Sequence, residues 1–206
     1  MSAEPRPDGV SAADGSAPSP TGPATDGSAP GGAGPKTGAG RPAFPSRGLM
    51  LGIVAGIVLL DQVTKAMVHA WLPLYSSVTV IPGLLDFSYV RNTGVAFGML
   101  NNVDIPFKPA LVSAIGLFAL IAISLYASRV PPGQRLARLG LASIIGGAVG
   151  NLIDRIASGY VVDFVDVYWG SWHFWAFNVA DAAITVGACC LILDMLFLDA
   201  HVSETA

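Results

Sequence analysis

The sequence predicts an all-α membrane protein: a four-transmembrane-helix bundle with a small strand-rich extracytoplasmic cradle between the first and second helices. Of the 206 residues, 52% are hydrophobic and only 12% are charged, whereas a soluble domain has about 25% charged residues. Four apolar segments approach the roughly 20 residues with which a helix crosses a bilayer: about 49–70, 109–128, 137–157 and 177–198. Helices are predicted there because a helix satisfies its own backbone hydrogen bonds in lipid.

The first 47 residues differ in composition from the rest of the chain. Residues 1–47 are rich in Pro, Gly, Ala and Ser and lack periodic apolar positions, so burial cannot offset the entropy of ordering them. We therefore expect a disordered cytoplasmic tail, followed by a membrane domain at 48–199 and a short cytoplasmic C-terminus at 200–206. The first apolar stretch begins only at Leu49, which is not the form of a cleaved secretory signal.

The distribution of arginines predicts how the bundle is oriented. Basic residues precede the first span and crowd the short connection between the second and third spans: Arg41, Arg47, Arg129, Arg135 and Arg138. The positive-inside rule places both regions in the cytoplasm. Both termini are then cytoplasmic, and the loops at about 71–108 and 158–176 face outward.

The two outer loops differ in character. The region of about 74–100 contains β-branched and aromatic residues interrupted by turn signals, a pattern that predicts short strands. The second outer loop carries five aromatic side chains, which are typical of a belt at the membrane interface: Tyr168, Trp169, Trp172, Phe174 and Trp175.

Composition also excludes several functional classes. The net charge of -3 leaves no basic surface for nucleic acid. Cys189 and Cys190 are adjacent within an apolar run and cannot staple a secreted fold. The histidines His69, His173 and His201 lack metal-ligand spacing, so no metal site is expected.

Polar residues cluster in the outer half of the predicted bundle. Asp61 and Lys65 are four residues apart, which favours an ion pair on one helical face. Asn92 and Gly94 belong to a turn-like segment. Asp194 is expected to reach water near the cytoplasmic end.

The third and fourth spans add two further groups. Asn151, Asp154 and Arg155 share one face beside three glycines, which fits either a packing surface ending in an Asp154–Arg155 pair or a polar cap that faces a ligand. Asn178 and Asp181 share another face, and Asn178 could also be a helix N-cap.

The convergence of these groups at one depth predicts a binding or active site. The carboxylates available for chemistry are Asp163 and Asp181, with Asp154 as the other candidate. Two acids in a poorly hydrated site cannot both ionise easily, so one keeps its proton and the pair can activate water without a cofactor. A small proton-linked membrane transporter and a non-catalytic scaffold are the competing interpretations.

In this order, the motifs DQVTK, RNTGVAFG, GGAVGNLIDR, VVDF and FNVADAAI closely resemble the bacterial lipoprotein signal peptidases, the type II signal peptidase family of aspartic proteases. The resemblance covers about 49–198. It implies an inner-membrane endopeptidase that cleaves prolipoproteins just before a diacylglyceryl-modified cysteine. Prolipoproteins and membrane lipid would be its partners, and cyclic peptide antibiotics its inhibitors; we expect a monomer.

Carried over by motif, the resemblance implies a role for each polar residue. The catalytic dyad falls on Asp163 and Asp181. The residues that line the substrate site would be Asn92, Asn151, Asp154, Arg155 and Asn178, with Asp61, Lys65 and Gly94 as supports. A further acid, Asp166, would either perturb the titration of Asp163 or face water.

Overall fold

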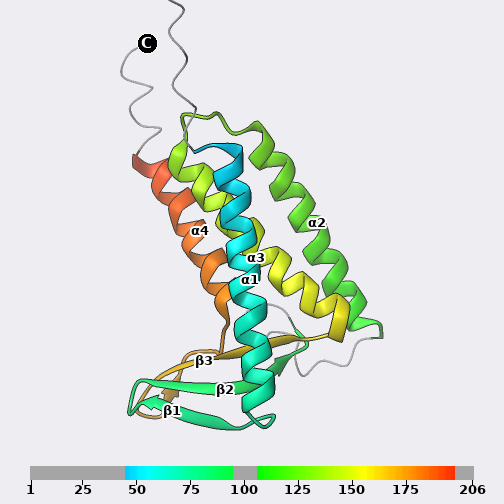
Figure 1. Ribbon diagram of the computed structural model, residues 1–206, viewed down its shortest axis with the longest axis vertical. Coiled ribbons are helices and arrows are strands. Elements are labelled where there is room, and N and C mark those ends of the chain that lie inside the picture. Colours follow the sequence, from blue (N-terminus) through cyan, green and yellow to red (C-terminus); the bar gives the residue numbers. More distant parts are fainter. Residues whose placement is uncertain (1–44, 95–105, 198–206) are drawn as a thin grey trace, which may run out of the picture. The chain divides into compact units, whose positions relative to one another are not determined.

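A computed structural model describes residues 45–94 and 106–197 of the chain. Nearly all of the predicted tail, and all of the predicted C-terminal segment 200–206, lie outside the described residues. The described chain contains four long helices (Figure 1): α1 (Arg47–Trp71), α2 (Lys108–Arg129), α3 (Arg135–Ser158) and α4 (Val179–Phe197). Each begins and ends within two residues of the span predicted for it.

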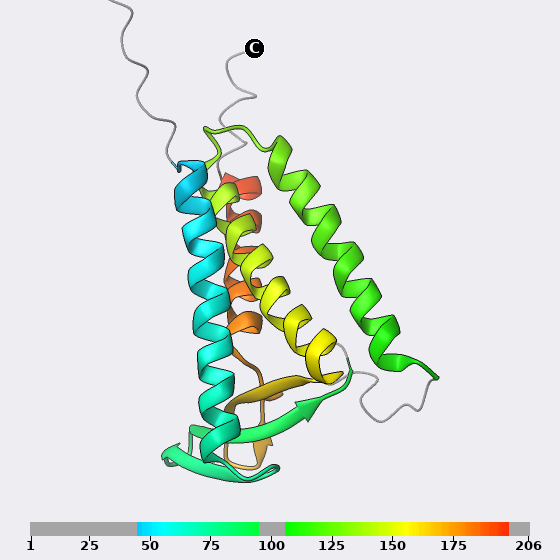
Figure 2. The ribbon, with the colours of Figure 1, turned by 45° about the vertical axis from the view of Figure 1, so that its right-hand side comes forward.

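All four helices are long and apolar enough to cross a membrane, with mean hydropathies between 1.5 and 2.3 over their central windows. The predicted fold class is therefore confirmed. Only α3 is substantially covered by protein, since half of its spanning window is buried, against 6% for α2 and 17% for α1. The other helices surround α3 (Figures 1 and 2) and leave large apolar side chains exposed, as expected of surfaces that contact lipid.

Small residues allow α3 and α4 to approach closely. A Cβ added at Gly140 would lie 2.7 Å from the carbonyl oxygen of Gly187, and one added at Gly187 would lie 2.5 Å from that of Gly140. A Cβ at Gly147 would collide with the carbonyl oxygen of Ala180. Of the three glycines predicted to form a packing surface, Gly147 thus faces α4, whereas Gly146 and Gly150 face Ile57 and Asp61 of α1. Gly140 and Gly187, which were not predicted, extend the close contact of α3 with α4, as in other small-residue helix pairs.

Asp194, which was expected to reach water, is instead buried, with 4% of its surface exposed. Leu191, three residues earlier on α4, packs against a core cluster that includes Leu141 of α3. Residues three apart share a helical face, so Asp194 lies on the face that α4 turns toward the bundle. The expectation was wrong because hydropathy does not reveal which face of the helix is covered.

The predicted cradle is a four-stranded antiparallel sheet in the order β1-β2-β3-β4. Its strands are β1 (Ser77–Ile81), β2 (Leu85–Asn92), β3 (Val161–Trp169) and β4 (Trp172–His173). The first two strands confirm the strands predicted between α1 and α2. The other two come from the loop between α3 and α4, which was predicted only as an aromatic belt. The cradle is therefore built from the connection between α1 and α2 and from that between α3 and α4.

The register of β2 against β3 positions two of the candidate residues. Asn92 pairs with Val161, and Val90 pairs with Asp163, so the end of β2 lies beside the start of β3. β3 begins two residues after the C-cap of α3, Gly159, which adopts the left-handed conformation with φ 79°. This turn brings β3 across the end of the bundle that adjoins the sheet (Figure 1).

Candidate active site

Asp163 is a buried carboxyl group at the start of β3, with 3% of its surface exposed. Its Oδ2 accepts a hydrogen bond from Nδ2 of Asn92 at 3.0 Å, and its Oδ1 accepts one from Nδ2 of Asn178 at 2.7 Å. Burial, together with the nearby charge of Asp181, raises the pKa of Asp163 to about 7, although the two amide donors and Lys65 oppose the shift. Asp163 can therefore exchange a proton near neutral pH.

Asp181 lies in the first turn of α4 and forms a reciprocal cap with Asn178. The backbone N–H of Asp181 donates to Oδ1 of Asn178 at 3.0 Å, and the backbone N–H of Asn178 donates to Oδ2 of Asp181 at 3.3 Å. This arrangement is a capping box, so the N-cap interpretation of Asn178 is confirmed. The same side chain also donates to Asp163, so capping and ligand-facing roles coexist in one residue.

Asn151 connects the two carboxyl groups to the rest of the bundle. Its Nδ2 donates to Oδ1 of Asp181 at 2.8 Å. Its Oδ1 accepts hydrogen bonds from Nδ2 of Asn178 at 3.2 Å and from Nζ of Lys65 at 3.0 Å. Since Lys65 can only donate, the ammonium group fixes which end of the Asn151 amide faces Asp181.

Lys65 forms two ion pairs in the interior of the bundle. Its Nζ lies 2.8 Å from Oδ2 of Asp61 and 2.9 Å from Oδ2 of Asp154. The predicted Asp61–Lys65 pair is thus confirmed. The suggested Asp154–Arg155 pair is not formed, because Asp154 turns toward α1 and bonds to Lys65 and to Nε2 of Gln62 at 3.0 Å.

Asp61 also ties α1 to the beginning of α4. Its Oδ1 accepts a hydrogen bond from the backbone N–H of Ala180 at 3.0 Å. The side chain of Asp61 is fully buried, and Gly150 leaves room for it: a Cβ at that position would lie 2.6 Å from Oδ2 of Asp61. Asp61 therefore helps to hold in place the turn that carries Asp181.

Arg155 closes the site on the side of β2. Its Nη2 donates to the carbonyl oxygen of Gly94 at 3.3 Å, and the N–H of Gly94 donates to Oδ1 of Asn92 at 2.9 Å. The Nε of Arg155 is buried and has no hydrogen-bond partner within 45–94 and 106–197. The guanidinium interacts electrostatically with Asp181 and Asp163, so its positive charge acts on both acids.

All ten residues singled out in the sequence are brought into this one network of hydrogen bonds and ion pairs. Sequence reasoning missed Gln62, which also donates to the carbonyl oxygen of Gly150 at 3.2 Å; its place between Asp61 and Lys65 was the available signal. Asp166 is turned elsewhere, with Oδ2 3.0 Å from Nδ1 of His173.

The donor set suits acid–base chemistry by carboxyl groups. Within the described part of the chain, no group of three or more His, Cys, Asp or Glu side chains could hold a metal ion. Two carboxyl groups are held by amide donors, and one has a pKa near neutrality. Such a pair can share a proton and can act as base and acid in turn.

Known proteins share both the sequence and the fold. A lipoprotein signal peptidase of Geobacter metallireducens is 46% identical over 144 residues, which cover 70% of this chain and 88% of the relative. The corresponding protein of Pseudomonas aeruginosa is 40% identical over 146 residues, covering 70% and 86%.

A bacterial membrane enzyme solved by the in meso method at 2.3 Å resolution has a TM-score of 0.67 and 31% identity, covering 78% of this chain and 93% of that one. A second such structure, at 1.9 Å resolution, has a TM-score of 0.65 and 27% identity, covering 73% and 94%. With these likenesses and four membrane-spanning helices, the protein is a bacterial membrane protein. Residues 53–197 match the family described as Signal peptidase (SPase) II, and the chain belongs to this family of peptidases.

Proposed function

We propose that this protein is an intramembrane aspartic endopeptidase that removes the signal peptide from diacylglyceryl-modified prolipoproteins. The observation that carries the proposal is the pair of acids, Asp163 and Asp181, joined through Asn178 and Asn151 in a buried network. Membership of the signal peptidase II family supports cleavage of a signal peptide, and relatives called lipoprotein signal peptidases support this substrate class. Cleavage falls just before the lipid-modified cysteine.

In the proposed mechanism the two carboxyl groups share one proton. The ionised carboxylate takes a proton from water as the water oxygen attacks the scissile carbonyl carbon, and the protonated carboxyl group donates a hydrogen bond to the carbonyl oxygen. The tetrahedral intermediate then collapses, the C–N bond breaks, and the proton taken from water is passed to the leaving amine. The pKa of about 7 for Asp163 supports a site that holds one proton near neutral pH.

The polar residues around the dyad have two proposed roles. Asn92, Asn151, Asp154, Arg155 and Asn178 are proposed to line the substrate site. Among them, Arg155 has a buried Nε without a hydrogen-bond partner in the described part of the chain, and a substrate carbonyl oxygen could accept from it. Asp154 instead acts through Lys65, because both of its carboxylate oxygens already accept hydrogen bonds within the protein. Asp61, Lys65 and Gly94 support the arrangement.

The orientation and partners follow from the same proposal. Both termini lie in the cytoplasm, and the active site faces the extracytoplasmic side of the inner membrane, with the cradle on that surface. The enzyme acts as a monomer and is inhibited by cyclic peptide antibiotics. The acyl chains of the substrate stay in lipid beside the bundle, so that membrane anchoring replaces a deep side-chain pocket. An unlipidated precursor should accordingly be cleaved far more slowly than the lipidated one.

The decisive experiment is a gel-shift cleavage assay on a diacylglyceryl-modified prolipoprotein in detergent. We expect Asp163→Asn and Asp181→Asn each to lower the rate at least about a thousandfold, since each removes a titrating group of the dyad. Asp154→Asn should retain partial activity, and Asp166→Asn, on the same strand as Asp163 but paired with His173, should be nearly unaffected. Full activity in Asp163→Asn would move the second acid to Asp154, and activity in all variants would exclude the aspartic mechanism.

A further inference from the structure

Arg91, near the C-terminal end of β2, is a cation that lies among aromatic rings. Its guanidinium carbon lies 4.5 Å from the ring centroid of Tyr160 and 5.8 Å from that of Tyr89. Its Nε and Nη2 make only long hydrogen bonds, of 3.4 and 3.5 Å, to the hydroxyl of Tyr89. Within residues 45–94 and 106–197, no carboxylate forms an ion pair with Arg91. Among the described residues no carboxylate therefore occupies the donors of Arg91, and these can donate to an anionic ligand.

A second tyrosine hydroxyl belongs to the ring on which this guanidinium lies. Burial and the neighbouring Tyr89 raise the pKa of Tyr160, so its hydroxyl keeps its proton and can donate. The ring of His69 lies 5.7 Å from that of Tyr89. An arginine with several hydroxyl donors is the arrangement that recognises a phosphate group, because the guanidinium supplies charge and the hydroxyls bind the remaining oxygens.

A cavity of about 210 Å³ adjoins this cluster between α1 and α3. Its exposed end is formed by His69, Ser158 and Tyr160, and its buried end by Lys65, Gln62 and Asp154. The carboxylate of Asp154 forms an ion pair with Lys65 at 2.9 Å and accepts a hydrogen bond from Gln62 at 3.0 Å, so its negative charge is compensated within the protein. The exposed end, beside Arg91, is where an anion would be received.

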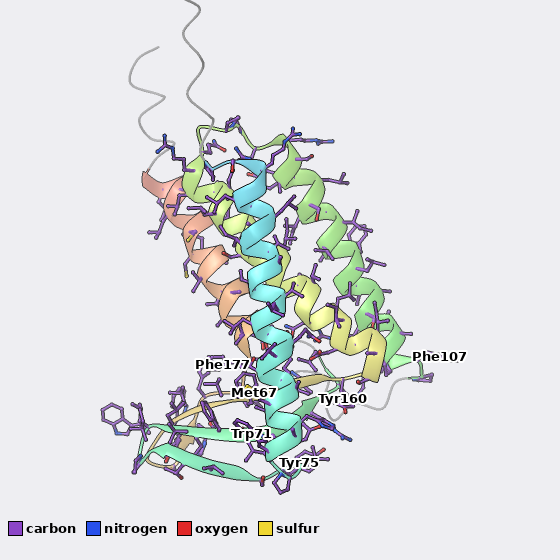
Figure 3. The ribbon with its side chains drawn as sticks, in the orientation of Figure 1. Met67, Trp71, Tyr75, Phe107, Tyr160 and Phe177 are labelled. Atoms are coloured by element: carbon purple, nitrogen blue, oxygen red, sulfur yellow. The ribbon has the colours of Figure 1, made fainter. Side chains whose placement is uncertain are left out.

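The cavity lies at the depth of lipid headgroups. His69 is in the last turn of α1, and Ser158 is the last residue of α3. Tyr160 lies beside this outer end of α1 in Figure 3. Large apolar side chains of α1 are exposed elsewhere along the helix, among them Leu59 (66%) and Val63 (46%), so acyl chains can lie against the helix while the headgroup stays at the cavity.

We propose that the cluster of Arg91, Tyr160, Ser158 and His69 binds the phosphate group of a phospholipid in the outer leaflet. The cluster contains neither acid of the dyad, and the binding does not depend on peptidase activity; only the choice of the outer leaflet rests on the orientation proposed above. The same chemistry would accept a soluble phosphate ester, but the place of the cavity at the ends of two membrane-spanning helices favours a lipid.

The test measures binding by native mass spectrometry of the full chain in detergent. The probes are dioleoylphosphatidylglycerol, dioleoylglycerol, which has the same acyl chains without phosphate, and glycerol 3-phosphate, which has the phosphate without chains. We expect the wild type to retain the phospholipid at least about tenfold more tightly than either partial probe, because it alone uses both the charged donors and the apolar surface.

Two variants locate the site. Arg91→Gln should weaken phospholipid binding by about tenfold or more through loss of the charged donor, and Tyr160→Phe should weaken it less while keeping the ring beneath Arg91. Arg129→Gln, an exposed arginine at the opposite end of the bundle, is the matched control and should bind as the wild type does. If Arg91→Gln does not fold, the phospholipid binding of Tyr160→Phe alone tests the proposal.

Three results would overturn the proposal. Equal retention of dioleoylglycerol would show that only the acyl chains are recognised. Equal binding of glycerol 3-phosphate would exclude a lipid as the source of the phosphate. Wild-type phospholipid binding in folded Arg91→Gln and in Tyr160→Phe would place any lipid elsewhere on the protein.

Discussion

Asn178 donates a hydrogen bond of 2.7 Å to Asp163 with the same side chain whose Oδ1 caps the helix carrying Asp181. One amide therefore sets the position of one acid directly and of the other through the start of α4. Its nitrogen also donates to Oδ1 of Asn151 at 3.2 Å, and Nδ2 of Asn151 in turn donates to Asp181. The two acids are thus linked through hydrogen bonds as well as through their charges. Replacing the amide of either Asn178 or Asn151 should therefore displace both acids.

Removing Asn92 should move the pH profile of cleavage to higher pH. The hydrogen bond from Asn92 stabilises the ionised form of Asp163 and so lowers its pKa. In Asn92→Ala this stabilisation is lost, and the limb of the profile that reports the deprotonation of Asp163 should move up by about one pH unit, the value of one hydrogen bond to a charged group. The measurement is kcat/KM for a lipidated substrate between pH 5 and 9.

The control for this change is Thr79→Ala, at an exposed position of β1 in the same sheet. It should leave the profile unchanged. A loss of activity in Asn92→Ala that is equal at every pH would contradict the electrostatic role and would leave Asn92 with substrate positioning only.

Lys65→Met should be strongly destabilising. The ammonium group compensates two carboxylates, Asp61 and Asp154, and its removal leaves them without a counter-charge in the bundle. Breaking a buried ion pair in this way costs about 3–5 kcal/mol, which should appear as a fall of the unfolding temperature by roughly 6–20 °C in detergent.

Arg129→Met is the matched control, because it also replaces a cation with Met but at an exposed position; its unfolding temperature should change little. Adding Asp61→Asn to Lys65→Met removes one of the uncompensated charges and should recover part of the loss. If the double variant were no more stable than Lys65→Met, the cost would lie in packing rather than in charge.

Gly150→Ala should disturb the site through Asp61. The added Cβ would lie 2.6 Å from Oδ2 of Asp61, a carboxylate that also receives the N–H of Ala180. We expect a destabilisation of about 1–3 kcal/mol from overpacking, with reduced cleavage because the start of α4 moves. Thermal unfolding and the gel-shift assay measure the two effects.

Gly52 offers the comparison within α1, since a Cβ there meets no atom within 4 Å. Gly52→Ala should be neutral or stabilising by up to about 1 kcal/mol, in line with helix propensity. Equal stability of the two variants would show that Asp61 moves aside without cost.

The bundle and half of the cradle could be predicted because their signals are local. Hydropathy places the four helices, and the spacing of Asp61 and Lys65 predicts their ion pair. The strand-like segment before α2 contains β1 and β2. These features depend on neighbours within a few residues, which a single sequence displays directly.

The remainder depends on contacts between distant segments. β2 pairs with β3, so Asn92 meets Asp163 across 71 residues of sequence. The partner of Asp154 is Lys65 on another helix, not the adjacent Arg155. Residue types and helical spacing could not distinguish Asp154 from Asp163 as a second acid, because the difference lies in the partners that each carboxylate finds after folding.

The burial of Asp163 should lower the folding stability of the protein by an amount that depends on pH. Burial and Asp181 raise the pKa of Asp163 from its ordinary 3.8 to about 7 in the folded protein. Between these two values the folded state binds more protons than the unfolded state, so the contribution of Asp163 to stability is fully present below about pH 4 and is lost as the pH rises through about 7. Asp163→Asn keeps the shape of the side chain and removes this titration. The variant should therefore unfold at a higher temperature than the wild type at pH 8, and the difference should shrink toward pH 4.

Asp166→Asn is the control, because this acid lies on the same strand but is paired with the exposed His173, and it should not show the same trend. A difference between Asp163→Asn and the wild type that stayed constant from pH 4 to pH 8 would mean that Asp163 titrates alike in the folded and unfolded states. In that case burial would not set its proton affinity.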